Sequence, residues 1–130
     1  MPAQCSFDYA VWQVVPRVER SERLNVGVVL LCRELGFLAA RVRLDEARLC
    51  ALAPRADVAR LHEALMVLER IAAGDPGAGP IAALEAPARF HWLVAPSSTT
   101  IQSSPVHCGL TAEPAVTLDR LFDRLVLADA

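Results

Sequence analysis

Residues 7–44 read FDYAVWQVVPRVERSERLNVGVVLLCRELGFLAARVRL, and this stretch decides the predicted fold. The segment Phe7 to Val15 carries apolar side chains on both faces of an extended chain, which predicts a strand that Pro16 ends. The run from Leu24 to Arg33 is apolar almost without alternation, as in a strand covered on both sides. From Phe37 to Leu44 apolar and polar residues alternate, which predicts a strand with one face toward solvent.

Short connections join these three segments. Residues 16–23 are rich in charge and predict a solvated loop or hairpin end, and Glu34-Leu35-Gly36 predicts a turn. Gly27 inside the second strand indicates a bulge or the close approach of another element. Connections of this length favour antiparallel pairing.

Two helices are predicted next. Asp45 can cap a short helix that runs through Leu52, before Pro54. A longer helix is predicted from Asp57 to Ala73, because apolar residues recur there at steps of three and four, and Gly74 is a suitable C-terminal stop. The Pro- and Gly-rich residues 75–87 predict a loop with one helical turn at 81–84.

The remaining chain predicts two strands and a helix. The strands cover Arg89 to Ala95 and Thr99 to Val106, with a turn at residues 96–98, and Pro105 either confines the second strand to an edge or ends it. An amphipathic helix begins at Pro114. The sequence therefore predicts a single α+β domain over residues 1–130, with a mainly antiparallel sheet of about five strands, three helices and the order βββ-αα-ββ-α.

Composition limits the classes of function. The hydrophobic fraction of 54% exceeds what a domain of this size must bury, so a protein partner or a homo-oligomer is expected to cover apolar surface. The longest apolar run, Val26 to Cys32, is far shorter than the roughly 20 residues of a membrane-spanning helix, and no secretory signal is visible, so a cytoplasmic protein is expected. The net charge of −2 argues against nucleic-acid binding.

No metal, cofactor or disulfide is expected. The four cysteines are widely spaced without a C-x-x-C pair, which is typical of reduced core residues: Cys5, Cys32, Cys50 and Cys108. The three histidines fit no metal-ligand spacing: His62, His91 and His107. GDPGAG lacks the ending of a phosphate-binding loop.

Two polar segments are candidates for a binding site. The first is the loop with Arg17, Glu19, Arg20 and, at the start of the next strand, Asn25. Its arginines could bind an anionic ligand, because the guanidinium fork matches phosphate and carboxylate, or the loop is simply a charged surface loop.

The second segment, Ser97 to Cys108, is dense in hydroxyl groups and includes Gln102 and His107. These groups could orient a polar ligand or the backbone of a partner, or they are ordinary residues of an edge strand. A nucleophilic triad is not supported: neighbouring His107 and Cys108 point to opposite faces of an extended chain.

The phrases YAVWQVVPRVERSERLNVGVVLLCRE and RFHWLVAPSSTTIQSSPVHCGL, with the closing amphipathic helix, resemble a family of short bacterial proteins described only as a domain of unknown function. Members of that family are often encoded beside HipA-type kinase-like proteins, which implies a partner role. The resemblance also implies that six residues gather at one site: Arg17, Glu19, Asn25, Arg89, Gln102 and His107.

Two functions follow as hypotheses. The first is a non-catalytic protein-interaction module, with a kinase-like protein as its partner. The alternative is a small enzyme or binder that acts on a phosphorylated or nucleotide-like ligand, in which Arg17, Arg20 and Arg89 hold the charge and His107 or Glu19 acts as general acid or base.

Overall fold

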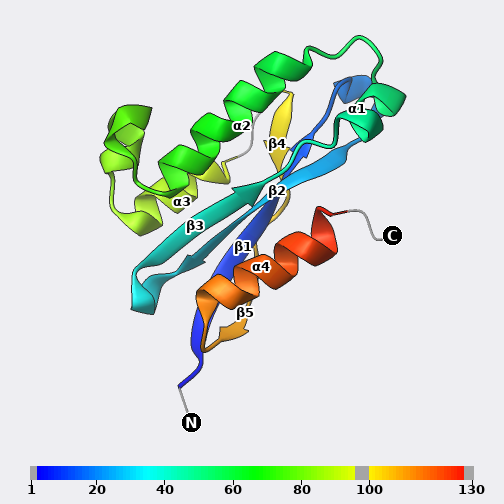
Figure 1. Ribbon diagram of the computed structural model, residues 1–130. Coiled ribbons are helices and arrows are strands. Elements are labelled where there is room, and N and C mark those ends of the chain that lie inside the picture. Colours follow the sequence, from blue (N-terminus) through cyan, green and yellow to red (C-terminus); the bar gives the residue numbers. More distant parts are fainter. Residues whose placement is uncertain (1–2, 96–99, 128–130) are drawn as a thin grey trace.

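The computed structural model describes residues 3–95 and 100–127. In these residues five strands form one antiparallel sheet, and four α-helices pack on its two faces (Figure 1). The strands are β1 (Cys5–Val14), β2 (Leu24–Cys32), β3 (Phe37–Val42), β4 (Ile101–Ser103) and β5 (His107–Thr111). The helices are α1 (Glu46–Leu52), α2 (Val58–Ala72), α3 (Ala86–Leu93) and α4 (Pro114–Leu125). Short 3-10 segments, η1 (Val18–Arg20), η2 (Arg33–Leu35), η3 (Pro76–Ala78) and η4 (Pro80–Ala83), lie in the connections. The predicted α+β class with an antiparallel sheet is confirmed.

Strand β1 lies between β2 on one side and two short strands, β4 and β5, on the other. On one side the order runs β3-β2-β1, and on the other side β4 pairs with Trp12 to Val14 while β5 pairs with Cys5 to Tyr9. Pro105 lies between β4 and β5, where the sequence predicts that the strand ends. The two short edge strands therefore pair with opposite halves of β1.

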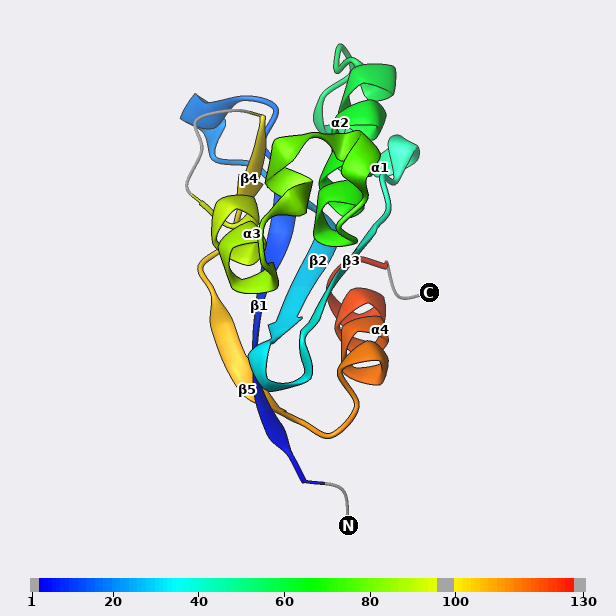
Figure 2. The same cartoon turned by 90° about the vertical axis from the view of Figure 1, so that its left-hand side faces the viewer.

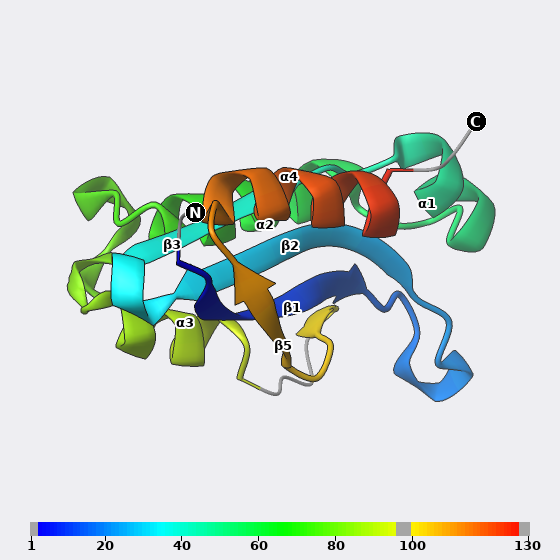
Figure 3. The same cartoon turned by 90° about the horizontal axis from the view of Figure 1, so that it is seen from below.

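The helices form two unequal layers. Helices α2 and α3 cover one face of the sheet and α4 covers the other (Figures 2 and 3). The core under α2 and α3 includes Trp12 and Leu65, and the smaller core under α4 includes Phe7 and Phe122. Strand β2 contributes buried residues to both cores, which is why its sequence shows no alternation.

A register shift in β2 explains Gly27. Trp12 pairs with Gly27, but the next residue of β1, Gln13, pairs with Asn25, so Val26 is an extra residue. A Cβ atom on Gly27 would lie 2.9 Å from Cε3 of Trp12. Both features expected of this glycine, a bulge and a close approach, are present.

The prediction of a strand over Arg89 to Ala95 is wrong, because these residues belong mainly to α3. Pro87 stands in the first turn of that helix, where its missing N–H costs nothing, and Phe90 and Leu93, three residues apart, are buried on one side. There are accordingly four α-helices rather than three among the described residues, and the order is βββ-ααα-ββ-α. The predicted turn at 96–98 lies outside the described residues.

The predicted strand over Thr99 to Val106 is also too long. Its described part is reduced to β4, and β5 was not predicted at all. Gly109 in β5 packs beneath the ring of Phe7, where a Cβ atom would lie only 2.8 Å from Cζ. Glycine usually argues against a strand in sequence, but here the packing of Phe7 requires it.

The helix boundaries agree better with the sequence. The side chains of Asp45 and Asp57 accept hydrogen bonds from the backbone N–H of the third residue of α1 and of α2, as N-cap residues do. Gly74 follows α2 with φ of 76°, and η4 occupies the predicted helical turn. No described helix is long and apolar enough to cross a membrane.

The cysteines divide into two pairs. Cys5 and Cys32 are buried, whereas Cys50 and Cys108 are exposed. The expectation of core positions is therefore wrong for the second pair. Burial, followed by the nearby carboxylate of Glu34, raises the pKa of the Cys5 thiol, so this sulfur is held in its unreactive form.

Candidate functional site

A groove lies beside the N-terminal part of α2, beyond the end of α3. Its volume is about 1350 Å³. Trp12 of β1, Leu93 of α3 and Ile101 of β4 contribute apolar lining, and α2 adds Leu61 and Leu68. We call this hollow the α2–β4 groove.

The lengths of the two covering helices explain the groove. Helix α3 has 8 residues and α2 has 15. Nη2 of Arg89 in α3 donates to the carbonyl oxygen of Ala72 at 3.3 Å, which places α3 beside the C-terminal end of α2. Residues of the N-terminal part of α2 and residues of β4 therefore line the same hollow.

Four arginines line the groove. Arg17 and Arg20 come from the loop between β1 and β2, Arg55 precedes α2, and Arg60 lies in its first turns. Among the described lining residues Asp57 carries the only carboxylate, and its oxygen accepts the backbone N–H of Arg60 as the N-cap of α2. Cationic groups therefore outnumber anionic ones around an apolar hollow, although the chain as a whole has a net charge of −2.

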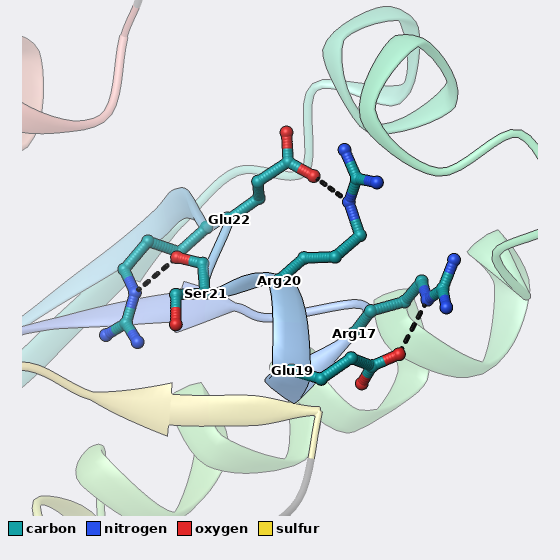
Figure 4. A network of polar contacts seen from close by, with 6 residues as sticks. Arg17, Glu19, Arg20, Ser21 and Glu22 are labelled. Carbon is teal, nitrogen blue, oxygen red and sulfur yellow. Dashed lines mark hydrogen bonds and ion pairs between the residues drawn. The ribbon is translucent and has the colours of Figure 1, made fainter.

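The loop arginines are already paired. Nε of Arg17 lies 2.8 Å from Oε1 of Glu19, and Arg20 pairs with Glu22 through Nε and Oε1 (Figure 4). The backbone N–H of Glu19 and the Arg17 guanidinium lower the pKa of Glu19, and the hydrogen bond from Arg20 lowers the pKa of Glu22. Both carboxylates are therefore ionised at neutral pH and offset the charge of their arginines.

Arg55 and Arg60 differ from the loop pair. Within residues 3–95 and 100–127, no carboxylate lies within ion-pair distance of either guanidinium. Among the lining arginines of the described chain, these two are the groups most able to bind an anion. Neither residue stands out in the sequence, because arginines near the start of a helix are common on protein surfaces. Only the fold places these two beside the groove.

The structure brings together part of the predicted site. Arg17, Arg20 and Gln102 all line the groove, and Glu19 lies beside it through its pair with Arg17. The backbone N–H of Val15 donates to the carbonyl oxygen of Thr100 at 2.7 Å, so the base of the loop adjoins the start of β4. The two polar segments therefore meet here, and Ser97 to Thr99 lie outside the described residues.

Asn25 lies on the other face of the sheet. Its Oδ1 accepts from Nε2 of Gln13 at 3.0 Å, and its Nδ2 donates to the carbonyl oxygen of Leu125 at 3.0 Å. Nη1 of Arg23 continues this chain of contacts to Oε1 of Gln13 at 3.1 Å. Asn25 thus joins the end of α4 to the sheet.

Arg89 and His107 also lie away from the groove. Nη1 of Arg89 donates to the carbonyl oxygen of Leu84 at 2.7 Å, so this arginine binds backbone carbonyls at the far end of the helix layer. His107 pairs with Tyr9 across β5 and β1, and their ring centroids are 5.3 Å apart. The six residues grouped by the family resemblance are therefore not all neighbours.

The groove combines aromatic and cationic side chains. Trp92 is 45% exposed at the rim and offers aromatic surface to an occupant, whereas Trp12 is 1% exposed and supports the floor from beneath. No histidine or cysteine occurs among the described lining residues, and no group of three potential metal ligands occurs in the described part of the chain. An apolar floor with guanidinium groups above it suits a molecule that is apolar on one side and anionic on the other.

Comparison with known proteins identifies the family. Residues 9–126 match the family described as "Protein of unknown function (DUF3037)". The chain belongs to the DUF3037 family. The resemblance to a domain of unknown function is thereby confirmed, and the match includes every strand and helix of this DUF3037 chain except the start of β1. No curated protein and no solved structure gives a significant match.

Proposed function

We propose that this chain is a non-catalytic interaction module whose α2–β4 groove accepts an acidic amphipathic segment of a cytoplasmic protein partner. The observation that carries the proposal is that Arg55 and Arg60, which have no carboxylate partner among the described residues, lie beside the apolar floor formed around Trp12. Acidic side chains of the partner segment would lie against the arginines at the rim, and its apolar side chains would pack on the floor.

The size of the groove supports a peptide segment. Small-molecule pockets usually measure about 300–1,000 Å³, whereas this groove has a volume of about 1350 Å³. An amphipathic helix that lays its apolar side into such a groove is a common mode of peptide recognition. Trp92, at the rim, then packs against the edge of the bound segment.

The alternative of an enzyme has less support. His107 lies beside Tyr9 in β5, away from the groove, and Glu19 already accepts a hydrogen bond from Arg17. A general acid or base needs to reach the proton that it transfers, and neither residue is free to do so at this hollow. Binding of a phosphorylated or nucleotide-like ligand by the arginines is therefore treated as the alternative result in the experiment below.

The test measures binding of a labelled helical peptide with a leucine stripe and glutamates beside it, using fluorescence anisotropy. Arg55→Ala with Arg60→Ala is expected to weaken binding about 5- to 30-fold, since each charged contact contributes roughly 0.5–1 kcal/mol. The matched control is Arg120→Ala with Arg124→Ala on exposed positions of α4, which should leave affinity unchanged.

Two results would remove the proposal. One is equal affinity for a peptide with lysines in place of the glutamates. The other is an equal loss of affinity in the α4 control. Saturable binding of ATP that depends on Arg55 and Arg60, without peptide binding, would instead support the nucleotide-like ligand. A kinase-like protein, which the family resemblance implies as a neighbour, is the first partner to test by co-purification.

A further inference from the structure

Strand β5 presents an unprotected edge of the sheet. Among the described residues β5 pairs only with β1, so its other side has no strand beside it. Natural proteins usually protect such edges with charged residues, proline or a bulge, because an open edge can pair with another chain. His107 to Thr111 contains no Asp, Glu, Lys, Arg or Pro.

The backbone groups that point outward can be assigned. The backbone N–H of Ser104 donates to the carbonyl oxygen of Val11, and the N–H of Val15 donates to the carbonyl oxygen of Thr100. Odd-numbered residues of β1 therefore turn their peptide groups toward this edge, and their partners in β5 are His107, Gly109 and Thr111. Because peptide groups alternate along a strand, those of Cys108 and Leu110 point away from β1.

Apolar side chains accompany these outward groups. Leu110 is 66% exposed, the highest value among the exposed large hydrophobic residues of the described chain. Val106 is 46% exposed and Cys108 is also exposed, and these alternate residues share one face of the edge. The edge thus combines outward hydrogen-bonding groups with a short apolar row.

The opposite edge of the sheet is different. Strand β3 carries exposed Arg41 and is followed by exposed Arg43. Antiparallel pairing of β3 with a second β3 would bring arginines of the two copies close together, and of these only Arg41 has a carboxylate partner, Asp119, among the described residues. Like charges across strands are destabilising. Pairing β5 with a second β5 brings no like charges together, so the charge pattern permits self-association at β5 and opposes it at β3.

We infer that two copies of the chain associate through antiparallel pairing of β5 with β5, about a two-fold axis at Cys108 or Gly109. Such an interface is self-complementary: outward N–H and C=O groups bond across the axis, and apolar residues lie beside one another. Pairing through a five-residue strand is expected to bury less than the roughly 1,200 Å² of stable complexes, so we expect a dissociation constant in the micromolar range, with monomer and dimer both populated there.

This interface is independent of the proposed groove. Strand β5 pairs with the Cys5 to Tyr9 half of β1 (Figure 3). The groove is lined instead by Trp12 and by residues of β4. Both grooves of the dimer remain open. Failure of peptide binding therefore leaves the dimer unaffected, and failure of dimerisation leaves the groove unaffected.

The first experiment uses cysteine crosslinking. Either position of the axis places the two Cys108 sulfurs within roughly 10 Å, which a short bismaleimide spans. Cys50 is the matched control, since it is equally a free, exposed cysteine but lies in α1. Covalent dimer is expected from Cys50→Ser and not from Cys108→Ser. Dimer that depends on Cys50 would contradict the inference.

The second experiment is sedimentation velocity over a range of micromolar concentrations. Leu110→Lys is expected to weaken self-association about tenfold or more by placing like charges across the axis. Leu35→Lys, at a residue 53% exposed in η2, should not. Circular dichroism verifies that both variants fold. A wild-type chain that stays monomeric at every concentration, or equal effects of the two variants, would overturn the inference.

Discussion

The two faces of the sheet are closed in different ways. Helix α4 is fixed by polar contacts along its length: Arg41 contacts Asp119 at 2.8 Å and lies 4.6 Å from the Phe122 ring centroid, and Asn25 binds the carbonyl of Leu125. On the other face two helices of unequal length share the surface, and they leave the α2–β4 groove. One face therefore serves stability, and the other combines stability with an accessible hollow.

The comparison separates arginines by their partners. Arg41 and Arg89 contact groups of the protein itself, whereas Arg55 and Arg60 have no carboxylate partner among the described residues. Residue type alone does not distinguish these roles. The contacts that each side chain makes in the fold do.

The largest effect is expected from Trp12→Ala. Trp12 is 1% exposed, and its Nε1 donates to the carbonyl oxygen of Leu93 at 3.0 Å. Removing the indole leaves a cavity and an unpaired carbonyl, so the free energy of unfolding should fall by about 3–5 kcal/mol in urea denaturation. Trp92→Ala, at the exposed rim, is the matched control and should cost less than about 1 kcal/mol. Similar losses of unfolding free energy in both variants would contradict the assignment of Trp12 as the buried support of the groove.

An intermediate effect is expected from Arg89→Met. The thioether side chain keeps much of the apolar volume but cannot donate to the carbonyl oxygens of Leu84 and Ala72. The free energy of unfolding should fall by about 1–3 kcal/mol. Arg60→Met should change stability by less than about 0.5 kcal/mol while it weakens peptide binding. The reverse pattern would exchange the structural and binding roles assigned to these arginines.

The smallest effect is expected from Asn25→Ala on the α4 face. This change removes the hydrogen bonds to Gln13 and to the carbonyl oxygen of Leu125, at a cost of about 1 kcal/mol. Hydrogen exchange should accelerate in the last turn of α4 and not in α2. Binding at the groove should be unchanged. Lost peptide binding with unchanged exchange would restore Asn25 to the binding site.

Much of the architecture follows from local sequence pattern. The hairpins of β1, β2 and β3 were predictable because apolar runs and polar turns agree there, and α2 was predictable from its periodicity and its cap at Asp57. The segment Arg89 to Ala95 was not. Its mixture of aromatic and branched residues favours a strand, and only Pro87 and the packing of Phe90 and Leu93 against the sheet make it a helix.

The candidate site was only partly predictable. Loop residues such as Arg17 stand out by composition, and the meeting of loop and β4 follows from pairing on β1. Arg55 and Arg60 could not be identified, because their significance depends on the empty space beside α2. Asn25 and Arg89 were misleading for the opposite reason: polar side chains that bind backbone carbonyls look the same in sequence as those that bind ligands.

The extra residue Val26 in β2 has a further consequence. If the ladder continued regularly past Gly27, Asn25 would lie opposite Val14 and its amide would enter the apolar layer, while Leu24 would turn toward α4. The bulge changes the phase of the pleat just after the chain leaves the charged loop. The number of residues in β2, and not only their types, therefore decides that Leu24 enters the core under α2 and α3 while Asn25 reaches the end of α4.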